Sequence, residues 1–113
     1  YICVPFYSLS VLIESCFDNV HNKHLGGTHT HLFTDKSLKE MLKKNNFYPA
    51  AEWWFGSDIM DLFRAIEVST IQRKNKLLID QLNKYKSLID DFQYIIDKNK
   101  LSSSIHIIFK RKN

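Results

Sequence analysis

Four histidines lie close together in the first third of the chain, at His21, His24, His29 and His31. Histidine is the commonest metal ligand and also the side chain whose charge changes near neutral pH, so two kinds of site are open. Against a zinc site, no Cys, Asp or Glu is interleaved with these histidines at ligand spacing. A general base, which takes the proton of a reacting hydroxyl group, is the better-supported hypothesis.

A helix with well-marked ends follows the histidines and must position them. The sequence predicts it over Asp35–Asn45, with Thr34 as the N-cap and Asn45-Asn46 as the stop. Asp35 lies in the first turn, where the helix dipole favours a negative charge. The spacing of the apolar residues gives the helix one packing face, made of Leu38, Met41 and Leu42.

The remaining elements follow from periodicity. Residues 1–4, 48–54 and 104–110 have the apolar and alternating patterns of strands, and Pro49 favours an edge position for the second of them. Helices are predicted over Leu9–Val20, from Asp58 onward, and over Lys74–Lys98. An exposed ion pair between Asp61 and Arg64 is expected on the second of these helices. The class is therefore α/β.

The segment Lys74–Lys98 carries apolar residues at alternating spacings of four and three. This is a heptad pattern, although it is shorter than three heptads. The helix is expected either to pack on the sheet or to pair with a second copy of the chain. The seam consists of Leu78, Leu82, Tyr85, Ile89, Phe92 and Ile96.

Length and composition allow one small domain, since the chain has 113 residues and an ordinary apolar content of 44%. No apolar run approaches the length of a membrane span. Cys3 and Cys16 lie among apolar residues and are interpreted as reduced core residues, which favours a cytoplasmic location. Because Tyr1 is not a start methionine and opens directly into a strand, we expect residues 1–113 to be a partial domain.

Charge is unevenly distributed. Residues 1–70 carry six Lys or Arg against eight Asp or Glu, whereas residues 71–113 carry ten against four. The lysines of the basic half are scattered around a helical pattern and form no run before the last residues. This indicates a solvated surface, and no nucleic-acid partner is predicted.

The histidine segment and its helix resemble the C-terminal half of class I S-adenosylmethionine-dependent methyltransferases. The similarity is closest to a group that includes quinone O-methyltransferases and enzymes of surface-glycan gene clusters. It rests on the pattern H-x-H-L-F-T followed by S-L-x-x-M-L and a phenylalanine; Asn46 stands where the family often has glycine. The residues concerned are His29, His31, Phe33, Thr34, Ser37, Leu38, Leu42 and Phe47.

The resemblance implies the C-terminal part of a Rossmann-like, seven-stranded fold, with a long helical insertion at about 70–99. The last strand would insert antiparallel between the other two. Residues 1–4 would then end at the active site, because ligands bind outside the carboxyl ends of strands in open α/β sheets. Candidate substrate-binding residues are Pro5, Phe6, Tyr7, Trp53 and Trp54. The implied general base is His29, with His31 as the second choice.

The same resemblance implies S-adenosyl-L-methionine as cofactor, although the glycine-rich loop that would hold it is not among these residues. The chain has three glycines, and none forms a G-x-G-x-x-G pattern after a strand. The expected function is transfer of a methyl group to a hydroxyl or amine of a small molecule, such as a sugar, with this chain alone inactive. The alternative is a non-catalytic interaction module that forms a homodimer through residues 74–98.

Overall fold

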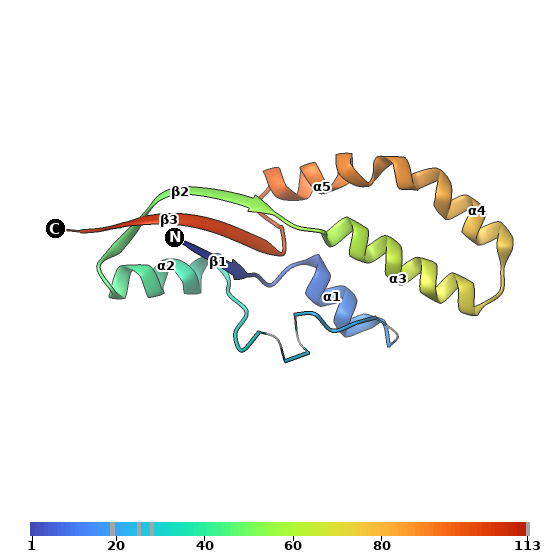
Figure 1. The fold of residues 1–113 in the computed structure, drawn as a ribbon, viewed down its shortest axis with the longest axis horizontal. Helices are drawn as coiled ribbons and strands as arrows, with labels where there is room; N and C mark the ends of the chain where they lie inside the picture. Colours follow the sequence, from blue (N-terminus) through green and yellow to red (C-terminus); the bar gives the residue numbers. More distant parts are fainter. Residues whose placement is uncertain (19, 25, 28, 113) are drawn as a thin grey trace.

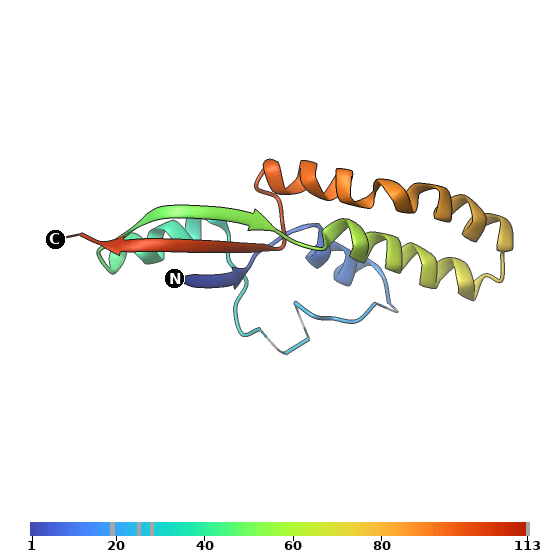
Figure 2. The same ribbon diagram turned by 45° about the horizontal axis from the view of Figure 1, so that its top comes forward.

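The sheet and a helical projection form the two ends of an elongated molecule of 61 × 28 × 17 Å. The computed structural model describes residues 1–18, 20–24, 26–27 and 29–112. Figures 1 and 2 show the sheet with α2 at one end and helices α3 to α5 at the other. The elements are β1 (Ile2–Pro5), α1 (Leu9–Cys16), α2 (Asp35–Lys44), β2 (Phe47–Phe55), α3 (Asp58–Gln72), α4 (Lys76–Tyr85), a 3₁₀ turn (Lys86–Leu88), α5 (Ile89–Lys98) and β3 (Ser104–Arg111).

β3 is the central strand of a three-stranded sheet with the order β1-β3-β2. It pairs antiparallel with both neighbours, so that Val4 and Trp54 lie on either side of Ile105. The α/β class, the strand positions and the edge position of β2 are therefore confirmed. Pro49 lies where the register of β2 shifts, which suits a residue that cannot donate to the ladder.

The ends of α2 follow the local signals in the sequence. The Thr34 hydroxyl accepts from the Ser37 backbone N–H at 3.1 Å, and the Ser37 hydroxyl accepts from the Thr34 N–H at 2.9 Å. This reciprocal capping box satisfies two backbone donors at the start of the helix. At the other end Asn46 has φ +59°, a left-handed conformation that asparagine tolerates. Asparagine thus makes the turn here without glycine.

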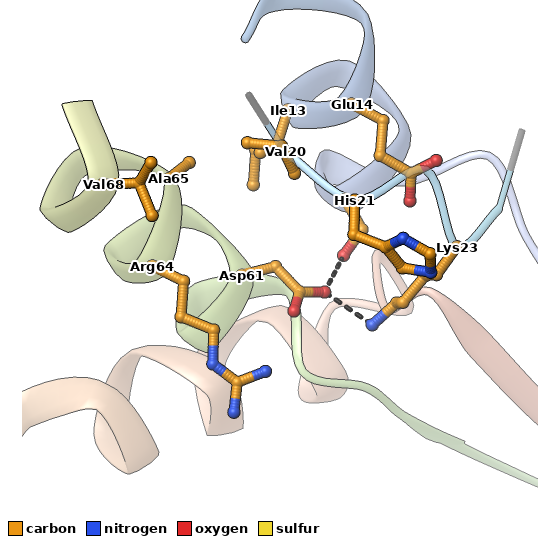
Figure 3. A pocket seen from close by; sticks show the side chains of 10 residues that line it. Ile13, Glu14, Val20, His21, Lys23, Asp61, Arg64, Ala65 and Val68 are labelled. Atoms are coloured by element: carbon orange, nitrogen blue, oxygen red, sulfur yellow. Dashed lines mark hydrogen bonds and ion pairs between the residues drawn. The ribbon is translucent and has the colours of Figure 1, made fainter. Parts of the chain in front are cut away.

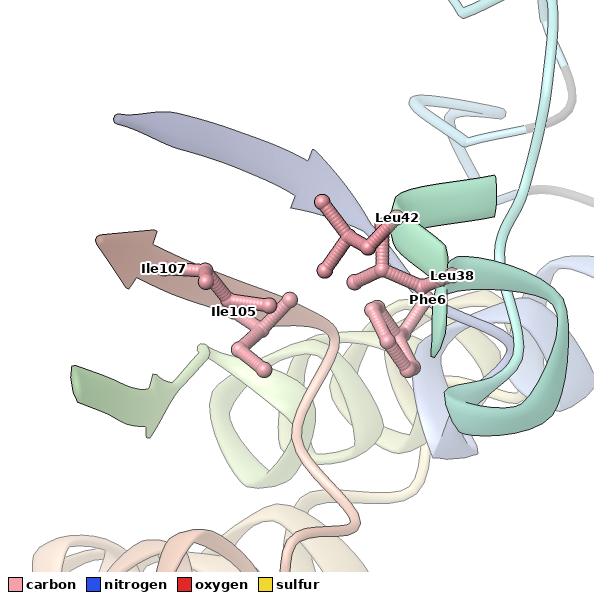
Figure 4. Packing of buried hydrophobic residues seen from close by; sticks show 5 residues of the cluster. All are labelled: Phe6, Leu38, Leu42, Ile105 and Ile107. Atoms are coloured by element: carbon pink, nitrogen blue, oxygen red, sulfur yellow. The ribbon is translucent and has the colours of Figure 1, made fainter. Parts of the chain in front are cut away.

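The core of the sheet end lies between α2 and one face of the sheet (Figure 4). Phe6, Leu38 and Ile105 are each no more than 3% exposed. Leu42 and Ile107 complete this buried cluster, and the side chains of Val4, Trp54 and Phe109 pack against it. Because the apolar residues of α2 are three and four positions apart, they reach the sheet from one helix face.

The helices α3, α4 and α5 form a projecting hairpin with its own small core. Ile59 and Phe63 of α3 pack against Ile89 of α5, with Leu82 and Ile96 alongside. The segment Lys74–Lys98, predicted as one or two helices, is two helices joined by the 3₁₀ turn. It packs chiefly on α3, and only α5 also approaches β2.

Several expectations for the first helix and the cysteines were wrong. α1 ends at Cys16, short of Val20, because Phe17 adopts an extended backbone. Cys3 and Cys16 are both exposed. Cys3 pairs in register with His106, on the face of the sheet away from α2, and Cys16 is the last residue of α1.

Of the helices in the described ranges, none combines the length and apolarity that crossing a bilayer requires.

Candidate functional site

A cavity of about 450 Å³ opens where β1 and β2 end and β3 begins. We call it the strand-end cavity. It lies at the carboxyl ends of two strands that run in the same direction, the usual place for ligands in open α/β sheets. Its lining combines polar and apolar residues: Cys3, Val4, Pro5, Lys23, His24, His29, Phe55, Gly56, Ser57, Ser103 and Ser104.

The chain beyond β1 holds the histidine segment beside this cavity. The Phe33 backbone N–H donates to the Pro5 carbonyl at 3.0 Å, and the Tyr7 N–H donates to the Phe33 carbonyl at 3.0 Å. This short parallel bridge between residues 6 and 33 continues the sheet by one position. The end of the histidine segment is thereby fixed next to the end of β1.

His24 forms a buried pair with Glu14 of α1. The ring nitrogen Nδ1 lies 2.6 Å from Glu14 Oε1, and the two side chains are only 4% and 3% exposed. The backbone N–H of His24 also donates to both oxygens of the same carboxylate, at 3.1 and 3.0 Å. Glu14 therefore fixes both the position and the orientation of the imidazole. Because Nδ1 faces a carboxylate, Nε2 is the ring nitrogen that the Glu14 contact leaves unused.

The two histidines favoured by the sequence lie near this pair but are exposed. The His29 ring stacks against His24 with a centroid separation of 6.2 Å and also lines the strand-end cavity. His31 makes a hydrogen bond of 2.9 Å through Nδ1 to the Thr30 hydroxyl. A neighbouring hollow of about 270 Å³ is lined by both of them, together with Tyr7 and His24. His31 does not line the strand-end cavity.

Lys23 is held in place by a polar network that reaches from α1 to α3. Its ammonium group donates to Asp61 Oδ2 at 2.6 Å and to the Ser57 hydroxyl at 2.9 Å. The Ser10 hydroxyl donates to the same Asp61 oxygen at 3.0 Å. Figure 3 shows the contacts of Asp61 in this network, at a second, smaller cavity of about 180 Å³. The expected partner of Asp61, Arg64, is not its partner in the structure, since Asp61 turns toward Lys23.

Asp58 joins three segments around the site and has no exposed surface. Its carboxylate accepts from the Ser10 N–H at 3.1 Å, the Ser10 hydroxyl at 2.9 Å and the Ser103 N–H at 2.8 Å. Burial acts to raise the pKa of Asp58, but hydrogen bonds from Ser8, Ser103 and Ser10 together outweigh it and lower the pKa. An ionised, fully bonded carboxylate therefore anchors α1 and the start of β3 on α3.

The predicted substrate-binding residues divide into three groups. Pro5 lines the strand-end cavity, and Tyr7 is exposed and lines the neighbouring hollow. Phe6 and Trp54 instead pack on each other in the core, with ring centroids 4.7 Å apart, because their side chains face α2. Trp53 points to the opposite sheet face, where it stacks with Tyr1 and His106. The prediction that Phe6, Trp53 and Trp54 line the candidate site is therefore corrected, since none of them lines the strand-end cavity or the neighbouring hollow.

Glu14 was the residue that sequence reasoning missed, and His24 was noted but not chosen. The one available signal was their chemistry, an acidic residue and a histidine ten positions apart around the end of α1. Their contact depends on the path of the chain after Cys16, which no local pattern specifies. Within the described ranges no group of three metal-ligating side chains comes together.

The glycines offer no cradle for the phosphate or ribose groups of a nucleoside cofactor. A side chain at Gly56 would collide with Asp58 and with Ser103, whose backbone nitrogen would lie 3.0 Å from its Cβ. Gly56 therefore serves close packing at the floor of the strand-end cavity. The described residues do not by themselves fit an S-adenosylmethionine site.

The comparisons with known proteins give no relatives. No family profile, no curated protein and no solved structure matches this chain.

Proposed function

We propose that this chain is the acceptor-binding part of an S-adenosylmethionine-dependent methyltransferase that acts on a hydroxyl group of a small molecule. The observation that carries the proposal is the buried Glu14–His24 pair at the edge of the strand-end cavity. A carboxylate that orients an imidazole beside a cavity is a common arrangement for proton abstraction. The sequence resemblance supplies the reaction class, and the sheet order is compatible with it.

His24 takes the role that the sequence had given to His29. A hydroxyl oxygen that accepts a methyl group must lose its proton, or the product would carry a positive charge. With Nδ1 bound to Glu14, the lone pair of Nε2 accepts this proton and the O–H bond breaks. The resulting imidazolium lies against the Glu14 carboxylate, which stabilises its charge in a buried environment. The cofactor would supply the methyl group from its sulfonium, with the carbon–sulfur bond breaking to leave a neutral thioether, and would be held by residues other than 1–113.

The cavity lining suits an acceptor that has both polar groups and apolar surface, as a sugar ring does, and Val4 and Pro5 contribute to its apolar part. Ser57, Ser103 and Ser104 place hydroxyl and backbone groups along one side, and Lys23 adds a positive charge that Asp61 largely balances. Phe55 gives one apolar surface. A volume of about 450 Å³ is enough for one or two sugar-sized rings, within the range of small-molecule sites. We infer that a sugar or a similar polyol is the acceptor class.

Methyl transfer by the natural full-length protein tests the proposal. His24→Gln should reduce turnover about a hundred- to ten-thousandfold, the usual contribution of general-base catalysis, with cofactor affinity unchanged. His21→Gln is the matched control, because His21 is exposed and lies outside the strand-end cavity. Full turnover by His24→Gln would reject His24 as the base. Absence of any methyl transfer by the wild-type protein over a panel of sugars would reject the function itself.

A further inference from the structure

The helical hairpin carries an exposed apolar stripe that nothing in the described chain covers. Leu78, Tyr85, Leu88, Phe92 and Ile95 are between 39% and 55% exposed. Their spacings of seven, three, four and three residues follow a heptad, so they share one side of the α4–α5 segment. Figures 1 and 2 show this segment running back along α3, with its other side free of covering elements. We call this set the hairpin stripe.

The structure separates the hairpin stripe from the residues that hold the hairpin together. Leu82, Ile89 and Ile96 point toward α3 and belong to its core cluster. The heptad seam of the sequence is therefore two adjacent rows, one used inside the molecule and one left open. An open row that extends over about 26 Å of helix is an interface feature rather than a scatter of single exposed residues.

Charged residues beside the hairpin stripe indicate that a second copy of the chain packs on it. Lys84 and Asp91 flank it on the same edge, seven residues apart, and both are exposed. If two copies pack antiparallel about an axis near Leu88, Lys84 of each copy faces Asp91 of the other. The same axis places Tyr85 opposite Leu88 and Leu78 opposite Ile95 of the second copy. A parallel pair would offer neither match, since it would bring each charge beside an apolar residue of the inner row.

We propose that the hairpin stripe is a homodimer interface, in which two hairpins pack antiparallel into a four-helix bundle. A helical hairpin that leaves one apolar row open on its α4–α5 segment is half of such a bundle, and a second copy completes it. A two-fold axis requires each patch to complement itself, which the Lys84–Asp91 pair and the apolar row both satisfy. This inference is independent of the proposed catalytic function.

Sedimentation equilibrium of the 113-residue chain over micromolar to submillimolar concentrations tests the interface. The wild-type chain should show a concentration-dependent dimer. Leu88→Glu should give a monomer at every concentration, because each dimer would bury two carboxylates without partners. Its circular dichroism should remain that of the wild type, since Leu88 is 39% exposed in the single chain. A monomeric wild-type chain at all concentrations would overturn the proposal.

Charge reversal tests the antiparallel arrangement. Lys84→Asp alone should weaken the dimer by about tenfold, because two attractive pairs become repulsive. Lys84→Asp combined with Asp91→Lys should restore the wild-type association. Asp80→Lys is the matched control, with the same charge change as Asp91→Lys at an exposed position off the stripe. A double variant as weak as Lys84→Asp would overturn the two-fold antiparallel packing.

Discussion

The carboxylate of Glu14 is hydrogen-bonded to His24 twice over, through the ring nitrogen Nδ1 and through the backbone N–H of the same residue. The backbone contact positions the loop, and the ring contact selects the tautomer. A loop residue that follows a two-turn helix thus acquires the fixed orientation of a residue in a regular element. This is the kind of support that a catalytic side chain needs when it lies on a loop.

The tautomer of His24 is the first consequence of that contact. We expect neutral His24 to carry its proton on Nδ1, because an ionised Glu14 accepts from that nitrogen and cannot donate to it. Long-range proton–nitrogen NMR spectra of the ring nitrogens would show this directly in the 113-residue chain. Glu14→Gln should relax the preference, since an amide can donate as well as accept. His21, which is exposed, is the internal control. A proton on Nε2 in the wild-type chain would contradict the assignment of that atom as the base.

The buried carboxylate of Asp58 makes the stability of the fold depend on pH in the acid range. The folded state lowers the pKa of Asp58 below the ordinary value of 3.8, which we take for the unfolded chain. Its contribution to the free energy of unfolding is therefore complete at pH values well above 3.8. The contribution is then lost as the pH falls from about 4 through the lower pKa of the folded state. Asp58→Asn should cost about 2 to 3 kcal/mol near neutral pH, because the hydrogen bonds to a charged acceptor are lost.

Urea unfolding at neutral and acid pH measures this contribution. The stability difference between the wild type and Asp58→Asn should shrink as the pH falls below about 4. Asp80→Asn, at an exposed position on α4, should be nearly neutral at both pH values. A difference that stays constant with pH would show that Asp58 is not the titrating group.

The packing of α2 on the sheet gives a further prediction. Leu38→Ala should lower the free energy of unfolding by about 3 kcal/mol, because Leu38 is 2% exposed and its removal leaves a void beside Ile105. Met41→Ala, three residues along the same helix and 37% exposed, should cost less than about 1 kcal/mol. Denaturant melts of the two variants compare them. Equal losses would mean that α2 is not seated on the sheet through this face.

Local signals predicted those parts of the fold that local chemistry determines. The N-cap at Thr34, the acidic first turn and the apolar face of α2 all involve residues within four positions of one another. Strand alternation in residues 104–110 likewise identified β3. The place of β3 between the other strands came from the resemblance alone, because periodicity carries no information about strand order.

The site depended on contacts that cross between elements. Cys3 was placed in the core because it lies among apolar residues, but one position along a strand reverses the face of a side chain. Trp53 and Trp54 show the same rule, since one packs in the core and its neighbour is 45% exposed. Glu14 lay on the polar side of a predicted helix, and only the course of the following loop brings His24 over it.

The central position of β3 also constrains the order in which the protein can fold during its synthesis. Within the described sheet β1 and β2 do not pair with each other, and each forms its backbone ladder with β3. Of the elements described here, β3 is the last to be synthesised. The hydrogen bonds of Asp58 to Ser10 and Ser103 likewise link residues that are far apart in the sequence. We expect α2 and the helical hairpin to form during synthesis, whereas the sheet can form only after β3 has been synthesised. Chains that stop before Ser104 should therefore remain open and be cleared by proteolysis.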